Sequence, residues 1–186
     1  MINPHADLHI NPPDLDSIDS VDVRTGAEVD PGALSLLPLL GVWRGVGEGD
    51  YPGMGPFRYG QLIRFFHDGR PFLGMQSHTW ILGADDQPTH LAGRESGWWR
   101  PGTGDDIEVI LTAADGIVAT YAGLARTSTS WDLTSDLVAR VPGAPEITAE
   151  KRLYGIVDGD LMYAIDMAAF DQPLQPHISA RLKRVQ

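Results

Sequence analysis

Short runs of alternating apolar and polar residues, separated by turn signals, fill most of the chain from residue 42 onward. Asp-Gly pairs occupy three of the intervening turns, at 68–69, 115–116 and 158–159. This pair tolerates the positive φ that a tight hairpin turn requires, so each one predicts two antiparallel neighbours. In residues 161–167 every second residue is apolar and forms one face. Repeated hairpins with almost no helical periodicity predict an antiparallel sheet.

The number of runs predicts how that sheet closes. The expected strands are residues 42–48, 58–66, 72–82, 97–100, 107–113, 117–124, 133–141, 147–157, 161–167 and 178–185. Such a succession predicts an all-β fold, an antiparallel up-and-down β-barrel of about ten strands. A barrel of this size encloses space for one small ligand, so a cavity is the first functional expectation.

The chain before the first strand divides into two parts. Residues 1–31 carry seven acidic residues and one arginine with little apolar periodicity, and they predict an extended or disordered arm. Five leucines between residues 34 and 40 then predict a short helical plug that leads into the first strand. We expect a single folded domain, the barrel, over residues 32–186.

Composition excludes several classes of function. The chain has no cysteine, which removes disulfides, thiolate zinc sites and cysteine nucleophiles. A formal net charge of −11 argues against nucleic acid and anionic membranes as partners, since both require clustered cations. No run approaches the roughly 20 apolar residues of a membrane span, and the N-terminus lacks the features of a secretory signal. The expected location is therefore the cytoplasm.

The stretch GVWRGVGEG at residues 41–49 places glycine at alternate positions for much of its length. A glycine-rich phosphate loop needs a helix after it, and the sequence DYPGMGP that follows cannot begin one. The stretch is better interpreted as a strand with Gly45, Gly47 and Gly49 on one face. There the missing side chains permit a sharp bend or the close approach of a flat group.

The six histidines are the first residues to consider as metal ligands. His5, His9 and His67 lie in the arm or in a turn, and we expect them to be solvated. His78 falls in an expected strand and His90 follows a turn, so either can face a pocket or solvent. No Ser-His-Asp or Glu-x-x-His arrangement stands out, and the scattered carboxylates do not support carbohydrate hydrolysis.

His177 follows a proline-punctuated loop at the entrance to the last strand. A lone imidazole at a barrel mouth can ligate an iron that a porphyrin already holds by four nitrogens. Exposure to solvent, or a satisfied structural role, is the alternative. Strict alternation puts His177 on the face of Ser179 and Arg181, opposite Ile178 and Ala180. An inward His177 therefore requires the regular strand to begin after it.

Several motifs, taken together and in order, resemble the nitrobindin family. They are Gly41, Trp43, Gly45, Gly47 and Gly49 in the pattern G-x-W-x-G-x-G-x-G, then Tyr51-Pro52, Phe57-Arg58-Tyr59, Thr79-Trp80, Glu95-Ser96-Gly97-Trp98-Trp99-Arg100-Pro101, Met167-Ala168-Ala169 and His177-Ile178-Ser179-Ala180-Arg181-Leu182. The resemblance runs from about residue 34 to the C-terminus, and only the acidic arm lies outside it.

Nitrobindins are β-barrels, similar in outline to fatty-acid-binding proteins and lipocalins, that hold one haem b in a shallow, solvent-accessible pocket. The resemblance implies that His177 is the proximal axial ligand of a ferric iron whose sixth position is open. It implies reversible binding of nitric oxide and isomerisation of peroxynitrite to nitrate, which makes the chain a haem-dependent peroxynitrite isomerase. Thr79, His78 and His90 are the candidates for the distal side of the haem pocket.

One departure concerns the lysine that the family often carries in an Ala-Lys-x-Val segment. Pro145 stands at the corresponding position and offers neither a cation nor a backbone donor, so Lys151 or Arg152 is the alternative anchor for the haem propionates. The rival hypothesis is a non-catalytic carrier of a fatty acid or another apolar molecule in the same barrel. A haem edge exposed at the mouth would also favour a homodimer.

Overall fold

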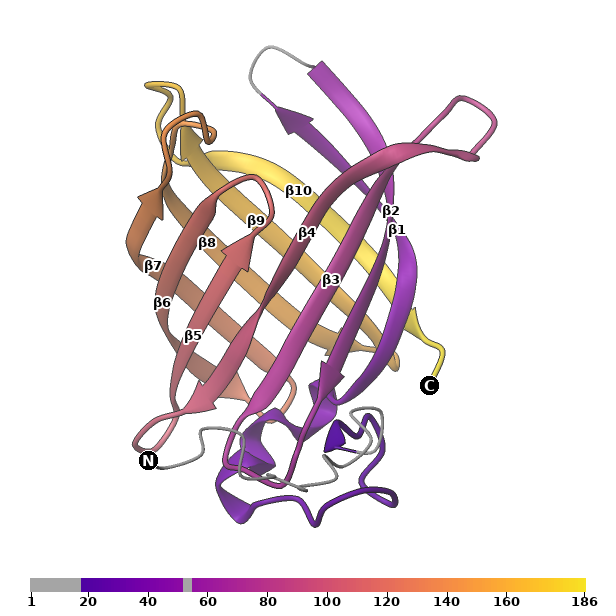
Figure 1. Cartoon of the computed structure of the whole chain (residues 1–186), viewed down its shortest axis with the longest axis vertical. Coiled ribbons are helices and arrows are strands. Elements are labelled where there is room, and N and C mark those ends of the chain that lie inside the picture. The colour runs from indigo at the N-terminus through magenta and orange to yellow at the C-terminus, as the bar shows by residue number, and fades with distance from the viewer. Residues whose placement is uncertain (1–17, 52–54) are drawn as a thin grey trace, which may run out of the picture.

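One short helix and a series of long strands follow one another along the chain (Figure 1). The computed structural model describes residues 18–51 and 55–186. The 3-10 helix η1 spans Pro31–Leu39, and the strands are β1 Gly41–Tyr51, β2 Gly55–Phe66, β3 Leu73–Leu82, β4 Pro88–Pro101, β5 Asp106–Ala113, β6 Ile117–Thr127, β7 Ser130–Arg140, β8 Ile147–Val157, β9 Asp160–Ala169 and β10 Gln175–Arg184. No helix within these residues is long and apolar enough to cross a membrane.

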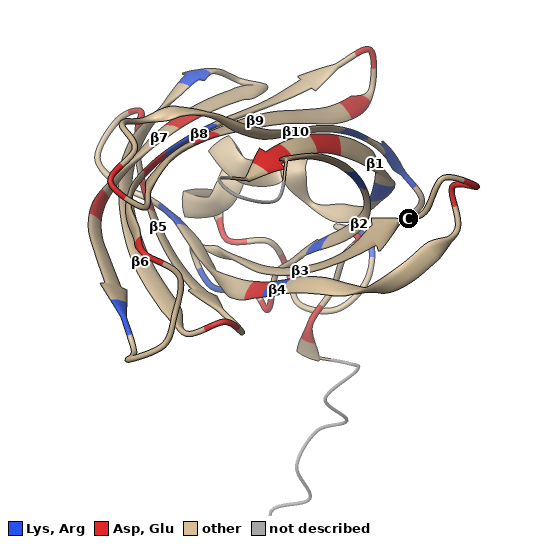
Figure 2. Cartoon of the chain, turned by 90° about the horizontal axis from the view of Figure 1, so that it is seen from above, with Lys and Arg blue, Asp and Glu red and all other residues tan. Residues whose placement is uncertain are grey.

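Each strand pairs with its neighbours in sequence, and β10 returns to pair with β1. All ten pairings are antiparallel, and the view along the barrel shows the closed ring (Figure 2). The predicted up-and-down barrel is therefore confirmed. One strand was predicted too short, because β4 begins at Pro88 whereas the sequence suggested residues 97–100. Residues 88–96 lack an alternating apolar pattern, but their backbone pairs with β3 through registers such as Thr79 with Gly93.

The predicted plug is confirmed as η1, which lies at the end of the barrel away from the β3–β4 and β9–β10 connections (Figure 1). Asp30 caps its first turn by accepting a hydrogen bond from the Gly32 backbone at 2.7 Å. Leu36 and Leu39 are fully buried. The indole of Trp43 donates to the Leu39 carbonyl at 2.7 Å, which joins the plug to β1. This end of the barrel is closed by packed side chains.

The expected arm over residues 1–31 falls partly on residues 1–17, which lie outside the described residues. In the described part, Ser20 and His67 exchange two backbone hydrogen bonds of 2.8 Å each. Ser20 is 7% exposed and His67 is 2% exposed. The expectation that His67 is solvated was therefore wrong, because the segment around Ser20 covers the end of β2. The described part of the arm is anchored to the barrel rather than free.

The glycines of β1 lie on its inner face, where the aromatic rings of β2 pack against them. A Cβ on Gly49 would lie 2.6 Å from Cζ of Phe57, and a Cβ on Gly47 would overlap both the Tyr59 ring and the Ser179 carbonyl oxygen of β10. Of the two alternatives that the sequence left open, a sharp bend or the approach of a flat group, the second is observed here, and the flat groups are side chains of the next strand. Glycine lets β1 lie close to β2 and β10 at once, which barrel closure requires.

Substituting Gly47 by alanine should destabilise the barrel. The new methyl group would press on the Tyr59 ring and on the β10 backbone, so we expect the free energy of unfolding to fall by about 1–3 kcal/mol. Gly155→Ala is the matched control, since the nearest atom to its added Cβ is 3.8 Å away. Chemical denaturation of both variants measures the difference, and equal stabilities would contradict the packing role of Gly47.

Candidate functional site

A cavity of about 570 Å³ occupies the barrel interior. This volume falls within the roughly 300–1,000 Å³ typical of small-molecule and cofactor sites. Its apolar wall includes Tyr51, Phe57, Ile81, Leu111 and Met167. The same cavity is lined by polar side chains from β2, β4, β8 and β9, so a ligand inside would meet both an apolar and a polar surface.

His177 reaches this cavity because β10 begins with a bulge. Pro176 pairs with Asp166 and Ile178 pairs with Ile165, which leaves His177 as an extra residue between two paired positions. A bulge re-aims the side chain it carries. His177 and Ile178 both line the interior, although they are adjacent in sequence. The condition that regular alternation begins after His177 is therefore met.

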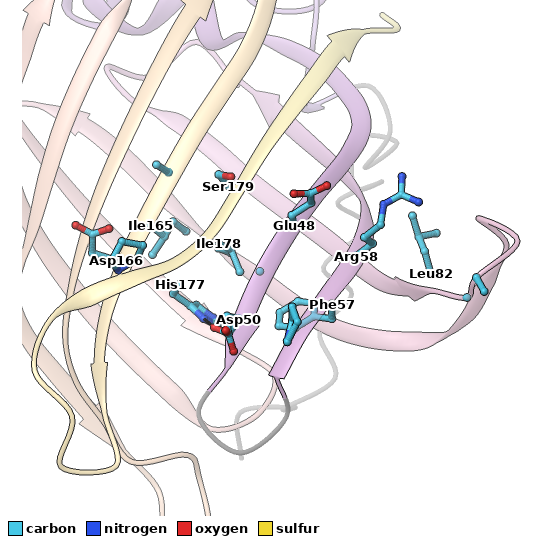
Figure 3. Close-up of a pocket in the computed structure, with 16 residues that line it drawn as sticks. Glu48, Asp50, Phe57, Arg58, Leu82, Ile165, Asp166, His177, Ile178 and Ser179 are labelled. Carbon is cyan, nitrogen blue, oxygen red and sulfur yellow. Dashed lines mark hydrogen bonds between the residues drawn. The ribbon is translucent and has the colours of Figure 1, made fainter.

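The position of the imidazole is fixed by the backbone of β1. Nδ1 of His177 lies 2.6 Å from the carbonyl oxygen of Asp50, and the two residues lie side by side in Figure 3. A carbonyl oxygen only accepts hydrogen bonds, so Nδ1 carries the proton in this contact. In the tautomer that this contact favours, Nε2 is the nitrogen whose lone pair a metal ion would take. The Tyr51 ring packs edge-on against the imidazole, with ring centroids 5.3 Å apart.

The imidazole also borders the outside of the barrel. A groove of about 860 Å³ lies on the outer surface near the mouth, and Figure 3 shows Glu48, Arg58 and Asp166 around it with His177. The Arg58 guanidinium pairs with Asp86 in the β3–β4 connection. His177 thus lies at the boundary between the interior cavity and the outer groove, and a group bound to it would have one edge near solvent.

Within residues 18–51 and 55–186, no cluster of three or more His, Asp or Glu side chains could hold a metal ion. A single neutral imidazole does not retain a free metal ion, because protein metal sites generally use several ligands. A metal bound here would have to arrive with most of its ligands already in place. A porphyrin meets that requirement with four nitrogens.

The other residues suggested by the sequence separate into two groups. Thr79, His90 and Pro145 line the same cavity as His177. His78 does not line it, because alternation along β3 turns Thr79 inward and His78 outward. The structure therefore places His78 away from the cavity.

The two residues suggested as propionate anchors, Lys151 and Arg152, lie on opposite faces of β8. Lys151 lies outside the cavity, with Nζ 3.8 Å from Oδ1 of Asp132. Arg152 points inward and is only 4% exposed. Because all its strong contacts are with carboxylates inside the barrel, its guanidinium is already engaged.

Arg152 is at the centre of a buried ionic cluster that lines the cavity. Its guanidinium forms two hydrogen bonds with Glu95, of 2.7 and 3.2 Å, and two with Glu150, of 2.8 and 3.1 Å. The Tyr121 hydroxyl donates to the Glu150 carboxylate, and the Tyr121 ring lies 5.0 Å from the guanidinium carbon. We call these four residues the Arg152 cluster.

The charges in the Arg152 cluster support one another. Burial alone would raise the pKa of Glu150, but attraction to Arg152 and the hydrogen bond from Tyr121 hold that pKa below its usual value. Burial raises the pKa of Tyr121 well above its usual value, with Glu150 adding to the shift. Glu150 is therefore an ionised acceptor at neutral pH, and Tyr121 stays a neutral donor.

A second buried network begins at Tyr59 on β2. The hydroxyls of Tyr59 and Tyr163 lie 2.7 Å apart, and the Tyr163 hydroxyl donates to Oε1 of Gln61 at 2.6 Å. Nε2 of Gln61 then donates to Ser77 at 2.8 Å and to Thr79 at 3.3 Å. Burial raises the pKa of Tyr163 well above its usual value, so this hydroxyl also remains neutral.

Sequence reasoning did not find most of this polar interior. The partners lie far apart in the chain, with Tyr121 and Glu150 29 residues apart and Gln61 and Tyr163 102 residues apart. One local pattern in the sequence could have indicated it. Glu150, Arg152 and Tyr154 alternate along one strand, which places two charged residues on the same inward face as a buried tyrosine.

Together, the fold and the site define a ligand-binding β-barrel with one metal-ligating imidazole at its mouth. Comparison with known proteins gives the same class. Residues 33–184 match the family described as the THAP4-like, heme-binding beta-barrel domain. The solved structure titled "Crystal Structure of Rv2717c from M. tuberculosis" matches with a TM-score of 0.76 and 34% identity, over 86% of this chain and 100% of that one. The chain belongs to this heme-binding barrel family.

Two curated relatives have names that indicate function. The chain is 45% identical to the peroxynitrite isomerase of Salinispora arenicola, over 98% of this chain and 97% of that protein. It is 44% identical to the ferric nitrobindin-like protein of Nocardia farcinica, over 89% of this chain and 72% of that protein. The resemblance to nitrobindins that the motifs suggested is therefore confirmed.

The Arg152 cluster should make the stability of the barrel depend on acid pH. The pKa of Glu150 is lowered in the folded state, so its contribution is present above its unfolded value of 4.5 and is lost as pH falls through the folded pKa. We expect Glu150→Gln to flatten the fall in stability below about pH 4.5. Urea unfolding at a series of pH values measures this slope, and parallel curves for the two proteins would show that Glu150 does not couple to folding.

Proposed function

We propose that the chain binds one haem b through Nε2 of His177, binds nitric oxide, and isomerises peroxynitrite to nitrate. The observation that carries this proposal is the hydrogen bond from Nδ1 of His177 to the Asp50 carbonyl, which leaves Nε2 as the nitrogen that can ligate a metal at the cavity mouth. Membership of the heme-binding barrel family and similarity to proteins named peroxynitrite isomerase support the same conclusion.

The residues present fit a haem. The donor set is one imidazole without further metal ligands nearby among the described residues, which suits an iron already held by a porphyrin. Tyr51 and Phe57 place aromatic rings within 5.3 and 6.4 Å of the imidazole, measured between centroids, and Ile81 lines the cavity beyond them. Apolar and aromatic surface of this kind is what a flat macrocycle packs against.

The bound haem would supply a ferric, Lewis-acidic iron. The chain contributes the rest. His177 would hold the iron, and the Asp50 carbonyl keeps the imidazole in the metal-binding tautomer. The apolar wall limits the access of water to the reacting groups. Thr79 presents a hydroxyl to the cavity, where it can donate a hydrogen bond to an oxygen of the substrate.

Transport of a fatty acid is the alternative that the cavity itself disfavours. A buried carboxylate needs a cation or several donors to replace the water it loses. Arg152 is the buried cation of this cavity, and both Glu95 and Glu150 already occupy its guanidinium. A second anion beside this cluster would meet net negative charge. Pro145, which lines the cavity without offering a charge, adds no anchor for it.

Other aspects of the proposed function stay predictions. They are a cytoplasmic location, a homodimer formed over the exposed haem edge, and the absence of nucleic acid or membrane partners. Propionate anchoring by Lys151 is also a prediction, and the outer position of that residue would place the propionates toward solvent. The burial of Arg152 between two carboxylates argues against it as the anchor.

Replacing His177 by alanine should abolish haem binding through a single axial imidazole while leaving the barrel folded. The side chain is only partly buried, so its removal does not open the core. Titration of ferric haem into purified apoprotein, followed by the absorption spectrum, should give a saturable one-to-one complex with the wild type only. His78→Ala is the matched control, because that imidazole lies on the outer face of β3.

The same titration separates the two hypotheses. An unchanged Soret band and affinity in the His177→Ala protein would overturn the assignment of the axial ligand. If the wild type takes up no haem but binds a fluorescent fatty acid with saturation, the carrier hypothesis replaces the present one. A complex with the expected spectrum then justifies measuring peroxynitrite decay in its presence.

A further inference from the structure

The Arg152 cluster carries more negative than positive charge inside the barrel. Two carboxylates, Glu95 and Glu150, share one guanidinium, and all three side chains line the cavity. Arg152 is 4% exposed and Glu150 is 9% exposed, so water screens them poorly. Buried ion pairs often stabilise a fold no better than apolar side chains of the same size. Stability is therefore not a sufficient reason for these charges, whatever Glu150 contributes to it.

The cluster lies close to the proposed haem ligand along the barrel wall. Arg152 on β8 pairs with Ile165 on β9, and Ile165 pairs with Ile178, the neighbour of His177 on β10. Two strand spacings of about 4.8 Å place the Arg152 backbone roughly 10 Å from the Ile178 backbone at the start of β10. His177 and the charged side chains of the cluster also line the same cavity. A charge in the cluster therefore faces the same interior as the imidazole, across two neighbouring strands.

We propose that the net negative charge of the Arg152 cluster holds a haem bound to His177 in the ferric state. One-electron reduction removes one positive charge from the iron, so a nearby buried anion stabilises the ferric form more than the ferrous form. The inference rests on the proposed function. It assigns to Glu95 and Glu150 an electrostatic role toward the iron and no contact with the substrate.

Tyr121 keeps the cluster in the required charge state. Its hydroxyl donates to Glu150, and its ring lies against the guanidinium, so Tyr121 contacts both charged partners. The bidentate contact with Glu95 fixes the other side of Arg152. A carboxylate in this arrangement remains ionised and stationary while the charge on the iron changes.

The test is the midpoint reduction potential of the haem-loaded protein, measured by spectroelectrochemistry at constant pH. Glu150→Gln removes a charge and keeps an oxygen that accepts from Tyr121. We expect a higher potential, equivalent to roughly tenfold more ferrous haem at a fixed applied potential. Glu95→Gln should act in the same direction. Glu150→Asp keeps the charge and should restore a potential close to that of the wild type.

Glu108→Gln is the matched control, since Glu108 is exposed on the outer strand surface. Its small effect should vanish at high salt, whereas the effects of the buried substitutions should persist. Comparing absorption spectra first confirms that each variant keeps the axial imidazole. If Glu150→Gln fails to fold, the potential of Glu95→Gln tests the electrostatic role. The Glu95 side chain is 24% exposed and tolerates neutralisation more readily.

The outcomes separate this inference from the proposed function. Potentials of Glu150→Gln and Glu95→Gln that equal that of Glu108→Gln, with intact haem spectra, would overturn the electrostatic role and leave haem binding in place. Failure of the wild type to bind haem through His177 would overturn both. A raised potential that returns toward the wild-type value in Glu150→Asp supports the proposal, because a packing defect would not follow the charge.

Discussion

The simultaneous pairing of β1 with β2 and β10 is the constraint on which the rest of the molecule depends. It closes the barrel, and it requires a strand that two neighbours can approach closely on a crowded inner face. Glycines at 45, 47 and 49 meet that requirement, since side chains there would overlap the β10 backbone or the aromatic rings of β2. Closure in turn aligns the end of β1 with the start of β10.

That alignment creates the site. Asp50 lies at the end of β1 and contributes only its carbonyl oxygen, yet this oxygen selects the tautomer and the orientation of His177. The bulge at Pro176 and Ile178 supplies the change of direction that regular alternation would forbid. The proposed haem ligand, His177, and the residue that positions it, Asp50, are thus 127 positions apart in sequence, and the pairing that closes the barrel brings them together.

Much of the fold could be predicted from the sequence, because alternation and Asp-Gly turns are local signals. The first half of β4 was missed, since backbone pairing with β3 sustains it without an apolar pattern. His177 could be singled out by its place before the last strand and by the family motif. Its direction could not, because alternation predicts the wrong face and only the pairing partners reveal the bulge. The burial of His67 was likewise invisible, since it depends on the distant Ser20.

The polar interior was the least predictable part and has the greatest consequence for function. Gln61, Tyr163 and Arg152 read as ordinary polar residues in the sequence, and only barrel closure brings their partners within hydrogen-bonding distance. A purely apolar interior would bind any hydrophobic molecule of suitable size. A cavity that already contains its own anions and a fully engaged arginine instead disfavours fatty acids and favours a group that carries positive charge at its centre. Because that charge changes when the iron is reduced, an interior that favours such a cofactor would also act on its oxidation state.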